Sequence, residues 1–88
     1  MTSPSIASDI LRFDAFADAL FAELELPPAT PGADTLLAED LGFDSVLLFE
    51  LLLVIEDWTG ALLPEALLGQ LLTVGDVYEV YRTRRAQR

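Results

Sequence analysis

Apolar residues recur at three- and four-residue spacing in the first third of the chain. They are Ile10, Phe13, Phe16, Ala17, Leu20, Phe21 and Leu24. This period places them on one face of an α-helix, which we expect from near Ser8 to near Glu25. Ser8 and Asp9 would supply the cap and the acidic first turn. The following Pro27-Pro28 pair predicts the end of the helix, because a residue before proline is pushed out of helical geometry.

A long loop is expected next. Residues 29–43 contain proline and glycine and have no helical period, apart from a short turn predicted at Leu36–Glu39. We expect Leu36, Leu37 and Leu41 to hold this loop against the core. A connection of this length in a small domain is unusual and is often functional.

The second half of the chain predicts two further helices and a short one. The first begins at Ser45, runs to about Trp58 and ends at Gly60. It is apolar nearly all round, with Glu50 the only acid in residues 45–55. A short helix should cover Pro64 to about Leu68, because proline is favoured in a first turn.

The last helix is predicted to open at Thr73-Val74-Gly75-Asp76 and to fray after Thr83. Thr73 would be the N-cap, with Asp76 completing a variant of the capping box. Its apolar face carries Val77, Tyr78, Val80 and Tyr81. Together the patterns predict an all-α fold in one domain, 1–88: a small bundle of three roughly antiparallel helices plus a short one. Its core would span about 6–83, with a basic tail at 84–88.

Charge and composition narrow the possible functions. The chain has no Cys or His, so disulfides, thiolate metal sites and histidine catalysis are excluded. The net charge is −10, and no Lys or Arg lies between Arg12 and Arg82. Such a field repels nucleic acid and anionic membranes and attracts basic protein surfaces, although excess acid also keeps a Leu-rich domain soluble. No leader segment or membrane-spanning run is evident, so we expect a cytoplasmic protein.

The chemical candidate is Ser45, in Leu41-Gly42-Phe43-Asp44-Ser45, where a loop turns into a helix. Its hydroxyl could cap the helix, or it could be a point of covalent attachment. An anionic adduct there would lie beside unpaired backbone N–H groups of the first helical turn. Carboxylate pairs such as Glu56 and Asp57 fall on solvated helix faces, which argues against catalysis and against a metal site.

The Leu-Gly-Phe-Asp-Ser loop is followed at fitting distances by Leu63-Pro64-Glu65 and by Thr73-Val74-Gly75-Asp76. This arrangement resembles the acyl carrier protein family over nearly the whole chain. The resemblance implies a non-catalytic carrier in which a phosphopantetheinyl transferase moves 4′-phosphopantetheine from coenzyme A onto Ser45, with Asp44 as its motif neighbour. Acyl groups would then be carried as thioesters and presented to acyltransferases, ketosynthases or similar enzymes.

In that family the serine loop and the helix after it form the docking surface for partner enzymes. Carried over to this chain, the docking residues are Gly42, Phe43, Val46, Leu47, Glu50, Leu53, Glu56 and Asp57. Phe43 could instead plug the loop onto the core. Trp58 could pack in the core or contact an acyl chain.

One departure from the family pattern concerns the residue after Val46. Many fatty-acid carriers have an acid where this chain has Leu47. This favours a specialised carrier of polyketide or related secondary metabolism over bacterial fatty-acid synthesis. The apolar surface could face a partner, lie under loop 29–43, or mediate self-association, although a monomer is expected. Alternatives remain: a peptidyl or aryl carrier, an excised rather than free-standing domain, or an unmodified helical interaction module.

Overall fold

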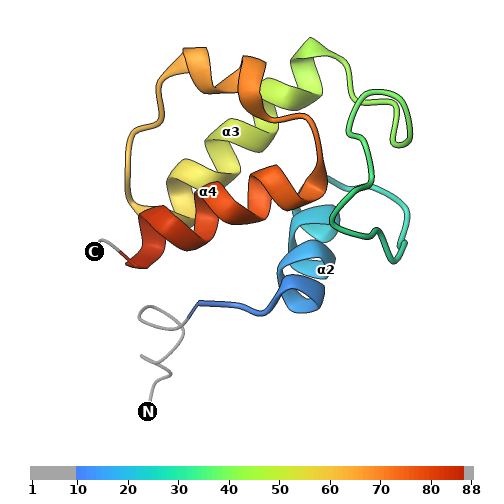
Figure 1. Ribbon diagram of the computed structural model, residues 1–88, viewed down its shortest axis with the longest axis horizontal. Helices are drawn as coiled ribbons and strands as arrows, with labels where there is room; N and C mark the ends of the chain where they lie inside the picture. Colours follow the sequence, from blue (N-terminus) through green and yellow to red (C-terminus); the bar gives the residue numbers. More distant parts are fainter. Residues whose placement is uncertain (1–9, 87–88) are drawn as a thin grey trace.

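The computed structural model describes residues 10–86, which form α-helices α2 (Phe13–Glu23), α3 (Ser45–Thr59) and α4 (Val74–Ala86) and the short 3₁₀-helix η1 (Glu65–Gln70) (Figure 1). Within these residues the one β-type pairing is an isolated antiparallel bridge between Leu36 and Thr73. The predicted all-α class, with a long loop before α3 and a short helix before α4, is confirmed.

The directions of the helices differ in one respect from the prediction. The Arg85 side chain donates to the carbonyl of Trp58 (2.7 Å), which joins the last turns of α4 and α3. At the opposite end, the Leu37 N–H donates to the Leu72 carbonyl (2.9 Å), which joins the loops that lead into both helices. Helices α3 and α4 therefore run in the same general direction, as Figure 1 shows, and only α2 opposes them.

Helix α2 starts later than the apolar period predicts. Leu11 lies outside the helix, its N–H donates to the Tyr81 hydroxyl (3.0 Å), and its carbonyl accepts from the Tyr78 hydroxyl (2.8 Å). Because α4 satisfies these backbone groups, the helix begins only at Phe13, with Arg12 as N-cap. The predicted Ser8 and Asp9 cap lies outside the described residues. The helix ends at Glu23, two residues before the predicted end.

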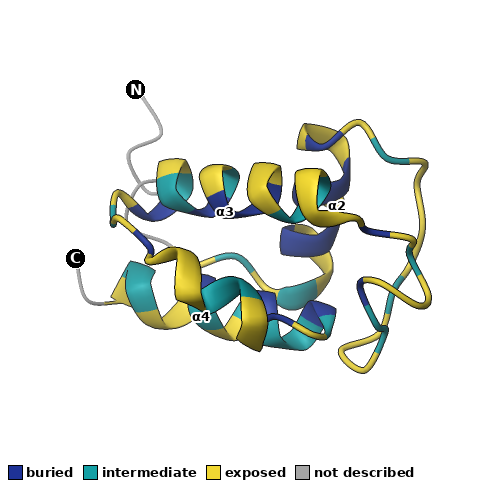
Figure 2. Cartoon of the chain, turned by 90° about the horizontal axis from the view of Figure 1, so that it is seen from above, coloured by how far each residue is buried: buried dark blue, intermediate teal, exposed yellow. Residues whose placement is uncertain are grey.

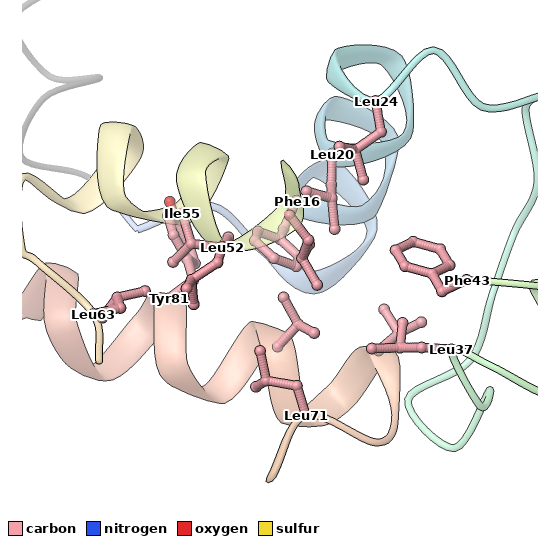
Figure 3. Packing of buried hydrophobic residues seen from close by; sticks show 13 residues of the cluster. Phe16, Leu20, Leu24, Leu37, Phe43, Leu52, Ile55, Leu63, Leu71 and Tyr81 are labelled. Atoms are coloured by element: carbon pink, nitrogen blue, oxygen red, sulfur yellow. The ribbon is translucent and has the colours of Figure 1, made fainter. Parts of the chain in front are cut away.

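The core lies between the three α-helices and is closed by the long loop. Its fully buried members include Phe16, Leu20, Leu51, Ile55, Val74 and Val77. Leu37 and Phe43 enter the same cluster from the loop (Figure 3). Leu41 packs against it while half-buried, so two of the three predicted loop anchors contact the core cluster, and Leu36 is held instead by its bridge to Thr73.

Five aromatic side chains form a cluster within this core. The Phe16 ring lies 4.8 Å from that of Tyr81, 5.2 Å from that of Tyr78 and 5.9 Å from that of Trp58, measured between ring centroids. Phe13 adds an edge-to-face contact with Tyr78. Trp58 therefore packs against α2 and α4, the first of its two predicted roles. This cluster ties the three helices together.

Gly60 and Pro64 mark the end of α3 and the start of η1. Gly60 closes α3 in the left-handed conformation with φ of 72°, as predicted. The short helix is shifted from the predicted Pro64–Leu68 to Glu65–Gln70. Pro64 has extended geometry and is its N-cap rather than part of its first turn.

The predicted capping box of α4 is confirmed. Thr73 Oγ1 accepts from the Asp76 N–H (3.0 Å), and Asp76 Oδ2 accepts from the N–H groups of Thr73 and Leu72 (3.0 Å each). At the other end, residues 83–86 are helical, which corrects the expected fraying after Thr83. The rest of the predicted basic tail, residues 87–88, lies outside the described residues.

Candidate functional site

The loop before Ser45 is fastened to the start of α4. The Val74 N–H donates to the Thr35 carbonyl (3.0 Å), and the Gly75 N–H donates to the Ala33 carbonyl (2.9 Å). A β-carbon on residue 75 would lie 2.8 Å from that same carbonyl oxygen, so glycine is what allows the two backbones to approach. These bonds and the Leu36–Thr73 bridge hold the loop from its middle onward.

A compact turn then brings the chain to α3. Asp40 Oδ2 accepts from the Leu36 N–H (2.9 Å), and the N–H groups of Asp40 and Leu41 donate back to the Leu36 carbonyl. Gly42 follows with φ of 73°, a left-handed conformation that glycine adopts at little cost. This reversal turns the side chain of the next residue, Phe43, inward.

Phe43 is buried, with 5% of its surface exposed, and its N–H donates to the Leu37 carbonyl (2.9 Å). The structure therefore supports the role in which the Phe43 side chain anchors the loop to the core. The expectation that the Phe43 side chain contacts docking partners is corrected, because the aromatic ring is packed beneath the loop (Figure 3).

The cap of α3 belongs to Asp44 rather than to Ser45. Asp44 has extended geometry, its Oδ1 accepts from the Leu47 N–H (2.8 Å), and its carbonyl accepts from the Leu48 N–H (3.0 Å). This hydrogen-bond pattern is that of an N-cap carboxylate. Ser45 is the first helical residue, so the idea that its hydroxyl caps the helix is wrong.

Ser45 is exposed, and its hydroxyl makes no hydrogen bond within residues 10–86. It stands at the N-terminal end of a helix of 15 residues, where unpaired backbone N–H groups and the helix dipole favour negative charge. A phosphodiester on this oxygen would thus meet a favourable field, while Asp44 supports the first turn. The residues present fit such a group.

Beside Ser45 the surface of α3 is apolar. Val46, Phe49 and Leu53 are 66%, 45% and 59% exposed, and their spacing places them on one face of the helix. We call these three residues the apolar stripe; the exposed side of α3 is visible in Figure 2. Sequence reasoning missed Phe49, although its position three residues after Val46 could have identified it.

The remaining predicted docking residues divide into two groups. Gly42, Glu50 and Asp57 are exposed near the stripe. Leu47 is half-buried against the core, and Glu56 is half-buried with Oε2 accepting from the Leu63 N–H (2.8 Å). Leu47 and Glu56, like Phe43, thus have side chains with structural contacts.

Other kinds of site find little support in residues 10–86. No cluster of three or more acidic, His or Cys side chains there could hold a metal ion. No helix in the same range is long and apolar enough to cross a bilayer.

Comparison with known proteins agrees with this geometry. A family model described as PP-binding, the phosphopantetheine attachment site, matches residues 14–80, which is most of the chain. Searches of curated proteins and of solved structures return no significant match. The matched range contains the capped α3 start, the loop that precedes it and most of α4. The chain therefore belongs to the acyl carrier protein family, whose members bind 4′-phosphopantetheine covalently.

Proposed function

We propose that Ser45 is the attachment point of 4′-phosphopantetheine and that the protein carries acyl intermediates as thioesters on this arm. It presents them to acyl-processing enzymes such as acyltransferases or ketosynthases and catalyses no step itself. The absence of an acid directly after Val46 favours polyketide or related secondary metabolism. We further propose that it acts as a monomer in the cytoplasm.

The observation that carries this proposal is that Asp44, and not Ser45, caps α3. Asp44 caps α3, and the exposed Ser45 hydroxyl has no hydrogen-bond partner among residues 10–86. In the attachment reaction, Ser45 Oγ would form a bond to the phosphorus of the phosphopantetheinyl group. The bond to 3′,5′-ADP of coenzyme A would break, and the hydroxyl proton would leave to a base of the transferase.

The direct test is incubation with coenzyme A and a promiscuous phosphopantetheinyl transferase, followed by intact-mass analysis. We expect a single mass increase of one phosphopantetheine, and fragmentation should place it on the peptide that contains Ser45. No increase on folded protein would instead support an unmodified interaction module. Thioester formation with acyl rather than aminoacyl substrates would separate an acyl carrier from a peptidyl carrier.

We also propose that the apolar stripe is the part of α3 that partner enzymes contact. The support is its exposure and its position beside Ser45, together with Glu50 and Asp57 on the exposed surface of the same helix. Exposed apolar patches next to a functional group often mark protein interfaces. The alternative is that the apolar stripe forms an interface between two copies of the chain.

Leu53→Asp should reduce transfer of the acyl group to a partner enzyme at least about tenfold while leaving the melting temperature nearly unchanged, because Leu53 is 59% exposed. Leu47→Asp should instead lower stability by about 1–3 kcal/mol, because it places a charge against the core. Transfer rates and thermal unfolding of both variants would check this.

Leu62→Asp is the matched control, since Leu62 is 88% exposed but lies outside α3. If it impairs transfer as much as Leu53→Asp does, added charge rather than lost contact is responsible, and the stripe has no docking role. Sedimentation would measure the oligomeric state of the unmodified protein and of its Leu53→Asp variant. A dimer that dissociates in the variant would identify the apolar stripe as a self-association surface.

A further inference from the structure

We infer that an apolar cavity at the end of α2, rather than the interior between α3 and η1, holds the acyl end of the arm on Ser45. This inference rests on the function proposed for Ser45. It adds the place where the carried group lies between reactions, and it sets a limit to the length of the acyl chain that is held there.

The cavity lies between the end of α2 and the turn that leads to α3. It has a volume of about 220 Å³. Its lining is apolar apart from Asp40 and consists otherwise of Phe21, Leu26, Pro27, Pro28, Ala29 and Leu41. An apolar cavity of about 150 Å³ binds benzene, so this one has room for about eight or nine carbons by proportion. The lining and the size therefore suit a short hydrocarbon chain.

Backbone hydrogen bonds at the end of α2 form one wall of the cavity. The Leu26 N–H donates to the Phe21 carbonyl (2.8 Å), and the Glu25 N–H donates to the Ala22 carbonyl (3.1 Å). Glu25 has φ of 60°, so these bonds make a left-handed helix end, in which the apolar residue that follows packs back on the last turn. The prolines after Leu26 restrict the backbone further. This wall is thus formed without a ligand, as is usual for small-molecule sites.

The opposite wall belongs to the turn just before Ser45. Leu41 is half-buried and packs against the core, which fixes its side chain. Asp40 Oδ2 accepts from the Leu36 N–H (2.9 Å), and the Asp40 N–H donates to the Leu36 carbonyl (3.0 Å). These contacts hold the second wall in place, so both sides of the cavity have a defined shape.

The cavity is within reach of an arm on Ser45. Leu41 precedes Ser45 by four residues, so their α-carbons are at most about 14 Å apart. The phosphopantetheine arm has slightly more bonds between its phosphorus and its sulfur than four residues of backbone have along the chain. A thioester at the end of the arm can therefore reach Leu41, and its acyl chain can enter the cavity from there.

Charge limits how far the acyl chain can extend. A second cavity, of about 300 Å³, shares Ala29 with the first and lies between α2 and residues 29–31. Asp14 and Asp18 are among its lining residues, and both are exposed. A chain that continued past Ala29 would displace water from these carboxylates, which is unfavourable. We therefore expect a medium-length acyl group to fit and additional carbons to gain nothing.

The test compares the protein loaded on Ser45 with an acetyl arm and with an octanoyl arm, each transferred from the matching coenzyme A thioester. Intact mass first confirms the loading, and amide NMR spectra of the two forms are then compared. We expect the largest shift differences at Leu26, Ala29 and Leu41, which line the cavity. Differences confined to α3 and η1 would place the chain between those helices, and no differences would leave it in solvent. Either result would overturn the inference.

Reaction of the thioester with hydroxylamine gives a second measurement. We expect the octanoyl group to be released at least about fivefold more slowly from the protein than from octanoyl-coenzyme A, because burial of even two methylenes favours the bound state by more than this factor. The acetyl group should show no such protection. A hexadecanoyl group should be protected no better than the octanoyl group, and stronger protection would contradict the limit set by Asp14 and Asp18.

Two matched variants locate the protection. Ala29→Trp fills part of the cavity and should remove the protection of the octanoyl group. Ala38→Trp makes the same change at an exposed position of the same loop that does not line the cavity, and it should keep the protection. Equal protection in both variants would overturn the inference. Failure of the proposed function is distinguishable from these outcomes, because the protein would then gain no mass with either coenzyme A thioester.

Discussion

Ser45→Ala is expected to abolish attachment of phosphopantetheine while leaving the protein folded. The substitution removes only an exposed oxygen that makes no hydrogen bond in the described residues, and alanine is favourable in the first turn of a helix. The free energy of unfolding should therefore change by less than about 0.5 kcal/mol. Intact-mass analysis and thermal unfolding of the same preparation would check both halves of the prediction.

Two further variants make this result specific. Thr30→Ala removes an exposed hydroxyl of the loop before α3, and this variant should still be modified fully. Asp44→Ala removes the cap and should cost about 1 kcal/mol of stability, which Ser45→Ala should not. Continued modification of Ser45→Ala would place the attachment point elsewhere, and a marked loss of its stability would return the capping role to Ser45.

Phe16→Ala should have the largest effect on stability, a loss of about 4 kcal/mol. Phe16 is fully buried, and its ring contacts Trp58, Tyr78 and Tyr81 from two other helices. Removal of the ring leaves a cavity where α2, α3 and α4 meet. Because small domains have only about 5–15 kcal/mol of stability, this loss would remove a large share of the free energy of unfolding. Urea unfolding followed by Trp58 fluorescence would measure the loss.

Phe49→Ala is the matched control, with the same change of side chain at an exposed position of the apolar stripe. It should cost less than about 1 kcal/mol, since Phe49 is 45% exposed. Similar losses for the two variants would show that Phe49 is as important to the core as Phe16, and its proposed place in a docking surface would have to be abandoned.

The elements of this fold with local chemical signals could be predicted from the sequence. Gly60 ends α3 and Thr73 with Asp76 caps α4, as expected, because these signals act within a few residues. The start of α2 could not be predicted in this way. Its position depends on hydroxyl groups of α4 that lie about seventy residues further along the chain and bind the backbone of Leu11.

At the candidate site, too, some features could be predicted from the sequence and others could not. The position of Ser45 at the start of a helix followed from the sequence, and so did the apolar character of the helix after it. The roles of its neighbours did not. Asp44 and Ser45 are both good capping residues, and only the hydrogen bond from Leu47 distinguishes them. The burial of Phe43 depends on the reversal at Gly42, which orients one aromatic ring inward.

The bonds that fasten the loop before Ser45 to the start of α4 also affect the order of events during synthesis. Residues 33–37 precede the site, yet their partners at 72–75 are translated about forty residues later. On the ribosome, the segment around Ser45 therefore emerges long before the backbone that holds it in place. The attachment site that we propose at Ser45 is held in place only after the start of α4 has been made, so we expect modification of shorter nascent chains to be disfavoured.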